Sequence, residues 1–228
     1  MTLQEAIRAR HSVRAYKEQP LAEEAAVRLR EKMAELNGQG RLHMQLIQNE
    51  PKAFQGTLAK YGRFRGVSNY MVMAGVKADD LDERLGYYGE QLVLLAQILG
   101  LNTCWVGLTY SKIPGTFELS QDEKIACYIA LGYGETQGSA HKTKTPDQVS
   151  NVGDDTPEWF KNGVEAALLA PTAVNQQKFS FEYAGTSEGR PRVRARKGFS
   201  MIGYTQLDMG IVKCHFEIGA GRNDIEWL

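Results

Sequence analysis

The hydrophobic positions in the N-terminal part of the chain follow two different periods, which predict helices alternating with strands. Apolar residues recur every three or four positions in Leu21–Leu36, and Gly38 is placed to end that helix. The densest helical pattern is Tyr87–Leu99, which has almost no polar face. A helix that is apolar nearly all round is buried in a core or at a subunit interface, so we expect Tyr87–Leu99 to be central.

Short apolar runs predict strands at Leu42–Gln48, Tyr70–Val76 and Ala126–Leu131. The second of these, YMVMAGV, is apolar enough for the middle of a sheet. The segment after Tyr87–Leu99 reads TCWVGLT, a short strand that breaks at Gly107. Glycine has no Cβ, so the backbone at Gly107 could approach a ligand closely.

The C-terminal part repeats the mixture of helix and strand. Glu158–Leu169 has helical spacing and ends before Pro171, which cannot continue a helix. Phe179–Ala184 alternates as a strand and pairs with Arg192–Arg196 in a predicted hairpin. A last helix follows, with a predicted capping box at Thr205–Asp208. The whole pattern predicts an α+β fold, and Asn151–Thr156 (NVGDDT) is the best candidate for a linker between two parts.

Composition excludes several classes of protein. Lys and Arg total 27, and Asp and Glu also total 27, so nothing suggests a basic surface for nucleic acid. No apolar run approaches the ~20 residues that a membrane-spanning helix needs, and the N-terminal segment lacks the apolar core of a signal peptide. The three cysteines form no CxxC pair, which suits free thiols in a reducing compartment. We therefore expect a cytoplasmic protein with no membrane or nucleic-acid partner.

Familiar catalytic and nucleotide-binding motifs are missing. The sequence has no GxGxxG after a strand, no GxxxxGK[ST], no HExxH and no GxSxG. The four histidines are scattered without the spacing of metal ligands. Cys214 and His215 are neighbours on a predicted helix, where adjacent side chains do not face each other. We expect neither a metal site nor thiol catalysis.

The first candidate for binding chemistry is the basic segment Arg8–Tyr16. Arg10 and Arg14 flank a histidine and a hydroxyl, His11 and Ser12. A guanidinium matches a phosphate group with two parallel hydrogen bonds, and a serine hydroxyl can add another. The alternative for this segment is a solvated basic helix end that faces the negative pole of its own helix.

The second candidate is a turn rich in carboxamides, Ala170–Phe179. Asn175, Gln176 and Gln177 lie between the predicted helix and strand. A carboxamide donates and accepts hydrogen bonds without charge, which suits a polyhydroxyl chain or the edge of a heteroaromatic ring. The alternative is a turn whose amides bond only to their own backbone. A further loop carries Lys142 and Lys144 and is a second cationic cluster.

Taken together, these segments resemble the FMN-dependent nitroreductase family. The resemblance rests on RARHSVRAY, LGLNTCWVG, LGYGE with a later KTK, and APTAVNQQKF, which span nearly the whole chain. It implies an α+β fold with bound FMN and names the residues that would hold this cofactor. These are Arg10, His11, Ser12 and Arg14, with Lys142 and Lys144, for the phosphate; Gly107 and Leu108 beside the ring; and Pro171, Thr172, Asn175 and Gln177 of the amide turn.

One departure from the family pattern carries information. Family members are usually homodimers in which the amide turn follows the basic segment closely in sequence. Here it appears only beyond residue 170, in a second part without a basic segment. The chain thus resembles a single-chain branch of the family, in which two degenerate halves, 1–150 and 151–228, pack as an intrachain pseudo-dimer. The first half would hold the phosphate, and the second would hold the ribityl chain and the far side of the ring.

The resemblance implies an oxidoreductase that passes electrons from NADH or NADPH through FMN to a small electron-poor acceptor, nitroaromatic or quinone-like. Because the flavin carries the chemistry, we expect no catalytic residue from the protein. Two other interpretations stay open. The chain could be a flavin-binding protein for storage or sensing without turnover, or a purely structural pseudo-dimer.

Overall fold

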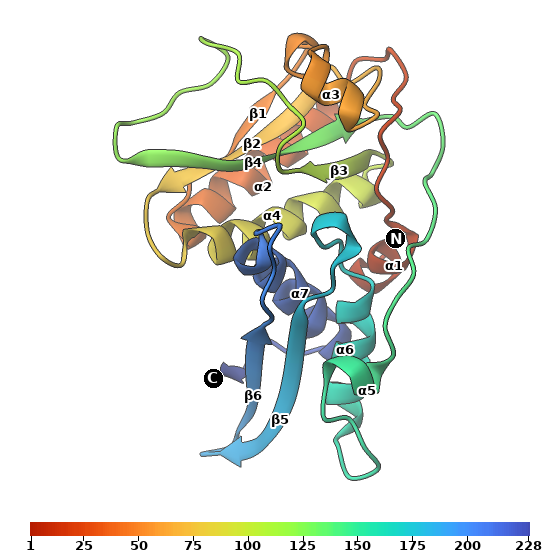
Figure 1. The fold of residues 1–228 in the computed structure, drawn as a ribbon, viewed down its shortest axis with the longest axis vertical. Helices are drawn as coiled ribbons and strands as arrows, with labels where there is room; N and C mark the ends of the chain where they lie inside the picture. Colours follow the sequence, from red (N-terminus) through yellow and green to blue (C-terminus); the bar gives the residue numbers. More distant parts are fainter.

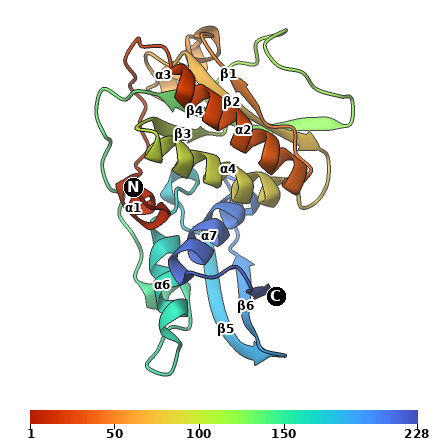
Figure 2. The same cartoon turned by 180° about the vertical axis from the view of Figure 1, so that it is seen from behind.

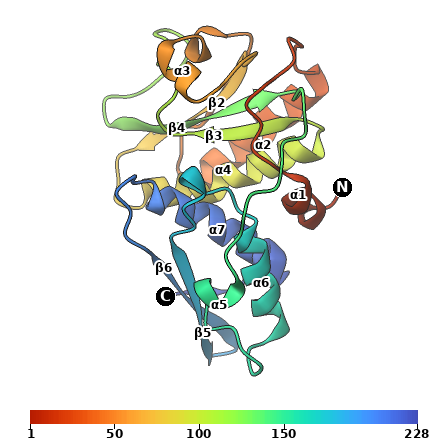
Figure 3. The same ribbon diagram turned by 45° about the vertical axis from the view of Figure 1, so that its right-hand side comes forward.

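Two β-sheets are separated by a pair of long crossing helices in the computed structural model, which describes residues 1–228 (Figures 1 and 3). The larger sheet and the helices next to it come from the N-terminal part of the chain. The smaller sheet comes from the C-terminal part, from Phe179 onward. The two crossing helices, α4 (Leu81–Ile98) and α7 (Thr205–Ala220), join the two parts through a shared apolar core.

The larger sheet has four antiparallel strands in the order β1-β2-β4-β3. Its strands are β1 (Gln45–Ile47), β2 (Asn69–Val76), β3 (Asn102–Val106) and β4 (Glu123–Gly132). All residues of β2 except the last are buried, as its apolar sequence predicts for a strand covered on both faces. A register shift between Met73 and Ala74 marks a bulge against β4.

Five further helical segments lie in the N-terminal and middle parts of the chain. They are α1 (Leu3–Ala9), α2 (Glu23–Gly40), η1 (Lys52–Phe54), α3 (Thr57–Tyr61) and α5 (Pro146–Val149). Figure 2 shows α2 and α4 lying together across one face of the four-stranded sheet. The capping box at the start of α1 forms between Thr2 and Glu5.

The C-terminal part consists of α6 (Glu158–Leu168), η2 (Ala173–Asn175) and the second sheet with α7. The predicted hairpin is confirmed: β5 (Phe179–Ser187) and β6 (Arg190–Lys197) pair antiparallel, and β7 (Glu226–Trp227) adds parallel to β6. The expected linker does not stand free of this part. Ser150 forms a bridge with Phe181, and the Asn151 side chain bonds the backbone of Tyr183.

Two glycines allow α4 and α7 to touch backbone to backbone. A Cβ at Gly86 would collide with the carbonyl oxygen of Leu207, and a Cβ at Gly210 would collide with that of Glu83. The contact is reciprocal, because each glycine faces the other helix's backbone. The expectation that the Tyr87–Leu99 segment is central is confirmed, and the helix begins earlier, at Leu81.

Three local predictions need correction. Gly38 does not end α2, which continues to Gly40 and closes with Arg41 in the left-handed region. The first strand is shorter than Leu42–Gln48, because the Asn37 side chain occupies both backbone groups of Met44 (2.9 Å each). The capping box predicted for α7 is absent: Tyr204 is the N-cap residue, and Asp208 bonds elsewhere. No helix has the length and apolarity that crossing a membrane requires.

Candidate cofactor site

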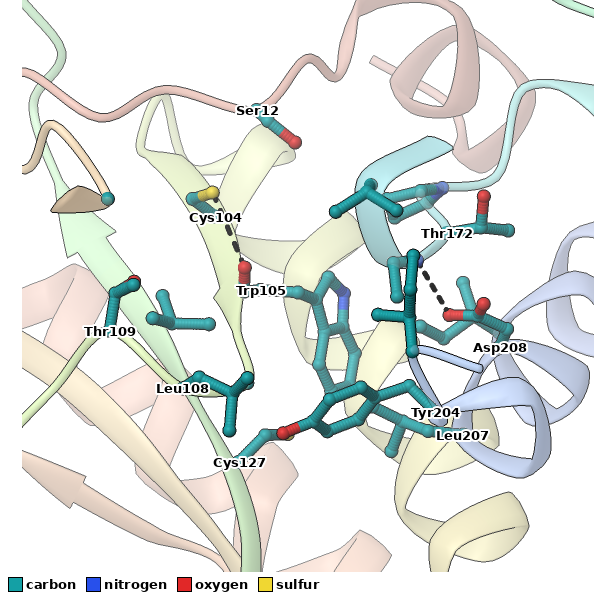
Figure 4. Close-up of a pocket in the computed structure, with 18 of the residues that line it drawn as sticks. Ser12, Cys104, Trp105, Leu108, Thr109, Cys127, Thr172, Tyr204, Leu207 and Asp208 are labelled. Atoms are coloured by element: carbon teal, nitrogen blue, oxygen red, sulfur yellow. Dashed lines mark hydrogen bonds between the residues drawn. The ribbon is translucent and has the colours of Figure 1, made fainter. Parts of the chain in front are cut away.

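A cavity of about 320 Å3 opens between the end of β3 and the start of α7 (Figure 4). Its walls come from the basic N-terminal segment, the residues at and after the end of β3, the turn after α6, and the loop leading into α7. This volume falls in the range of small-molecule sites, about 300–1,000 Å3. The cavity therefore receives residues from both the N-terminal and the C-terminal parts of one chain.

The basic segment contributes Ser12 and Arg14 to this cavity. The segment is extended and runs beside β3, with the Val13 N–H donating to the Thr103 carbonyl at 3.0 Å. In an extended chain, successive side chains point to opposite sides. Val13 is accordingly buried in the core, while Ser12 and Arg14 face the cavity. Arg14 is exposed and forms no ion pair, so its charge is available to a ligand.

Arg10, the other arginine predicted to bind phosphate, does not line the cavity. Its side chain is 3% exposed, with Nε 3.9 Å from Glu90 Oε1 and Nη2 donating to the Leu169 carbonyl at 3.5 Å. Burial lowers the pKa of Arg10, partly offset by the Glu90 charge. His11 lies at the edge of this region, where burial and then the Arg10 and His141 charges lower its pKa.

A buried polar network lies under the cavity floor and joins the two parts of the chain. The Trp105 indole, which lines the cavity, donates through Nε1 to Glu90 Oε2 at 2.8 Å. The other carboxylate oxygen lies 2.9 Å from His215 Nε2, and His215 Nδ1 lies 3.1 Å from the Ala166 carbonyl. Both ring nitrogens thus face oxygen acceptors, and the ring satisfies both contacts when each nitrogen carries a proton.

Gly107 and Leu108 line the cavity as a pair after β3. Leu108 is 70% exposed, whereas Gly107 packs against the ring of Tyr204. A Cβ at Gly107 would lie 2.6 Å from Tyr204 Cζ, so a larger residue here would displace the Tyr204 ring. Figure 4 shows the Tyr204 ring crossing the lower part of the cavity near Leu108 and Cys127.

The amide turn divides into two groups of residues. Pro171 and Thr172 line the cavity, but Asn175 and Gln177 do not. Asn175 Nδ2 and Gln177 Nε2 both donate to the Lys142 carbonyl, at 2.8 and 2.9 Å, and Gln177 Oε1 accepts from the Lys144 N–H. These two amides therefore hold the 142–144 loop in place.

The same loop explains where the two lysines lie. Lys144 Nζ donates to the Gln177 carbonyl at 2.7 Å, while Lys142 is exposed and forms no ion pair. Neither lysine lines the cavity. The structure thus brings together Ser12, Arg14, Gly107, Leu108, Pro171 and Thr172, and it places Arg10, His11, Lys142, Lys144, Asn175 and Gln177 outside the cavity walls.

Asp208 is a site residue that the sequence prediction missed. It lines the cavity, accepts from the Ala173 N–H at 3.0 Å and from Gln176 Nε2 at 2.7 Å, and so fixes the turn after α6. Burial raises its pKa to about 6, against the lowering effect of these hydrogen bonds. Its spacing from Thr205 predicted a capping box, and no local signal showed that the carboxylate would reach the turn instead.

Trp105, Tyr204 and two cysteines are among the other cavity residues that the prediction omitted. Cys104 and Cys127 are both buried, and burial raises the pKa of each thiol. Neither is therefore a thiolate at neutral pH. Trp105 stood in the predicted strand, but the sequence did not show which face of the sheet its indole would take.

The chain thus has an α+β fold with a cavity that is cationic at one end and aromatic at its floor. A family model described as "Putative TM nitroreductase" matches residues 2–220. The chain belongs to this family, as the sequence resemblance implied. No curated protein matches the chain.

Solved structures support the same fold. The crystal structure of a "putative nitroreductase" from Thermotoga maritima is 21% identical, with a TM-score of 0.63; the match covers 96% of this chain and 83% of that one. A second, from Exiguobacterium sibiricum in complex with FMN, is 16% identical, with a TM-score of 0.52, covering 65% and 95%. A third FMN complex, from Desulfovibrio desulfuricans, is 15% identical, with a TM-score of 0.50, covering 69% and 99%. The predicted α+β, nitroreductase-like fold is confirmed.

Proposed function

We propose that this chain is an oxidoreductase that binds FMN in the cavity and passes electrons from NADH or NADPH to a small electron-poor acceptor. The observation that carries the proposal is the pairing of Ser12 and Arg14 with an apolar, aromatic floor in one cavity. FMN has the matching shape and charge, a flat ring system at one end and a phosphate at the other. The FMN bound in two structures of the same fold supports the choice of this cofactor.

The donor set fits this cofactor. The Arg14 guanidinium and the Ser12 hydroxyl would hold the phosphate with charge-assisted hydrogen bonds. Trp105 and the Gly107–Leu108 backbone would lie against the ring, and Thr172 would approach the ribityl side from the second part of the chain. FMN itself would supply reversible two-electron chemistry. The chain's own part is to orient the ring and to leave one face open to the donor and the acceptor.

The protein contributes no group that must act as an acid or base on the substrate. Cys104 and Cys127 carry protons at neutral pH, because burial disfavours their charged forms. Asp208 is held by two hydrogen bonds to the turn after α6, which gives its carboxylate a positioning role. We keep the sequence-based expectation that catalysis depends on orientation and electrostatics.

Both shares of the site come from one polypeptide, so we also propose that a single chain, acting as a pseudo-dimer of residues 1–150 and 151–228, forms one complete site. Ser12 and Arg14 come from the first half, and Thr172, Tyr204 and Asp208 come from the second. The backbone contact of α4 with α7 holds these halves together.

The test is spectroscopic. We expect the protein reconstituted with FMN to show a bound-flavin absorption spectrum, which NADH or NADPH bleaches under anaerobic conditions and a quinone or nitroaromatic restores. Bound flavin that neither nucleotide reduces would favour a storage or sensing protein. Failure to bind FMN would contradict the proposal as a whole.

A further inference from the structure

The mouth of the cavity is surrounded by apolar side chains that the fold leaves in water. Leu108, Val174 and Ile202 line the cavity and are 70%, 74% and 51% exposed. They come from three separate segments: the end of β3, the turn after α6, and the loop between β6 and α7. One apolar rim is thus assembled from both halves of the chain, at the place where a ligand must enter.

The loop between β6 and α7 extends this rim outward. In Gly198–Tyr204, Phe199 is 85% exposed and Met201 is 93% exposed, and Met201 adjoins Ile202 of the rim. In Figure 1 the loop leads from the top of β6 to the start of α7, beside the turn of η2. Exposed apolar residues scattered singly need no explanation, but a concentration at one mouth marks a binding surface.

The backbone at the rim is held in place despite local strain. Val174 adopts φ 46°, a left-handed conformation that is a clear outlier for a β-branched residue. Gly203 and Tyr204 are also left-handed, with φ 81° and 62°. The ends of the loop are tied down, since the Gly198 N–H donates to the Lys178 carbonyl at 2.7 Å and Gln176 Nε2 donates to the Gly203 carbonyl at 3.1 Å. The apolar side chains are therefore displayed by an anchored loop.

We propose that this rim and loop bind the apolar tail of the electron acceptor, so that the preferred acceptor is a quinone with a prenyl or alkyl chain. This inference rests on the proposed function. The quinone ring would enter the cavity, and its tail would leave over Ile202 and Val174 toward Met201 and Phe199. The nicotinamide gives up a hydride; the quinone gains two electrons and two protons, one proton with the hydride and one from solvent, and becomes a hydroquinone.

Two other occupants fit the surface less well. A stable contact with a second copy would need about 800 Å2 from each partner, and it would cover the cavity mouth that these residues surround. An anionic membrane surface would need several free cations beside the loop. The backbone next to the loop carries three cations, Lys178, Arg196 and Lys197, and Arg196 lies 3.9 Å from Glu182. These are fewer than the roughly four to eight cations of a polybasic membrane site. The rim residues also line the cavity. A ligand whose ring enters the cavity and whose tail lies over the rim would contact both surfaces at once.

The experiment compares ubiquinone analogues that share one ring, without a tail and with one prenyl unit. We expect the prenyl unit to lower KM roughly 10-fold, equivalent to about 1.4 kcal/mol, since each buried methylene contributes about 0.8 kcal/mol and the rim covers only part of the tail. In the double variant Phe199→Ser/Met201→Ser, this preference should fall to about 2-fold or less, with KM for the tail-free quinone unchanged. The matched control, Leu3→Ser/Val27→Ser, removes exposed apolar groups from α1 and α2 and should keep the preference.

Equilibrium binding separates this inference from the proposed function. Quenching of tryptophan fluorescence by each quinone reports affinity without turnover, so the tail preference can be measured even if the protein proves inactive. Equal affinity for the two quinones, or an unchanged preference in the loop variant, overturns the inference. A loop variant that changes only the sedimentation of the protein, or only its binding to anionic vesicles, also overturns it in favour of a second copy or a membrane.

Discussion

Glu90 and His215 meet at 2.9 Å between carboxylate and imidazole, and both side chains are fully buried. Glu90 lies on α4 and His215 on α7, so the contact joins the two halves of the chain at the crossing of the long helices. The same carboxylate holds the Trp105 indole in the cavity floor. The polar centre of the interface and the shape of the site therefore depend on one side chain.

Replacing Glu90 should lower the free energy of unfolding far more than replacing a surface carboxylate. Glu90→Ala leaves His215 and the indole N–H without their common acceptor and Arg10 without its nearest carboxylate. Removing one partner of a buried pair costs about 3–5 kcal/mol. Glu23→Ala, which breaks an exposed pair with Arg30, should change stability by less than about 0.5 kcal/mol. Urea unfolding measures both. A loss below about 1 kcal/mol for Glu90→Ala would contradict the importance of this network.

The glycine contact between α4 and α7 makes a second prediction about stability. Gly86→Ala or Gly210→Ala places a Cβ against the backbone of the facing helix, so we expect a loss of more than about 3 kcal/mol, because overpacking against rigid backbone cannot relax. Gly38→Ala is the matched control. It lies inside α2 with open space around it and should stabilise the protein by about 0.5–1 kcal/mol. Thermal and urea unfolding should show opposite signs for the two kinds of variant.

Asp208 makes stability depend on pH in an unusual direction. Its pKa is about 6 in the folded protein against 3.8 as the ordinary value, so the folded state holds the proton more tightly than the unfolded state. The free energy that protonated Asp208 contributes to the folded state is fully present below pH ~4 and is lost as pH rises to about 6. The shift corresponds to roughly 3 kcal/mol.

Asp208→Asn removes this titration and keeps the shape of the side chain. Relative to wild type, the variant should therefore be more stable at pH 7 than at pH 4, by up to about 3 kcal/mol. Any fixed cost of a changed bond to Gln176 cancels between the two pH values. A difference that stays constant from pH 4 to pH 7, measured by urea unfolding, would show that Asp208 does not titrate in this window.

The two arginines of the basic segment should have different roles. Arg14→Ala should weaken FMN binding about 10- to 150-fold, since a charge-assisted hydrogen bond contributes roughly 1.5–3 kcal/mol. Arg10→Ala should mainly reduce stability, because its guanidinium lies beside Glu90 and away from the cavity. Flavin titration followed by fluorescence distinguishes them, and Arg28→Ala, an exposed cation on α2, should have no effect. Tight binding of FMN by Arg14→Ala would rule out its phosphate role.

One FMN per monomeric chain is the expected stoichiometry. The rival arrangement is a dimer that exchanges second halves, in which each site is shared between two chains. Coexpression of Arg14→Ala chains with Ala173→Trp chains, whose indole would fill the cavity, separates the two arrangements. An exchanged dimer would regain one intact site, whereas every chain of a pseudo-dimer carries its own defect. We expect no recovery of flavin binding in the mixture.

The sequence by itself determined most of the elements, because local periodicity and chain breakers decide them. The buried helix before β3, the apolar strand β2 and the β5–β6 hairpin follow directly from their patterns. The joint occurrence of several short motifs was enough to indicate the family.

Only the tertiary structure decided which polar side chains face the cavity. Arg10 and Arg14 look alike in sequence, but Arg10 lies beside Glu90, a partner supplied by a distant helix. Asn175 and Gln177 donate hydrogen bonds to the backbone of the 142–144 loop, and Asp208 accepts one from the turn after α6. Each choice depends on a group that is close in space and far along the chain. A buried polar group needs a hydrogen-bond partner, and the fold decides which group lies close enough to be that partner. The residues next to it in sequence do not predict which group this is.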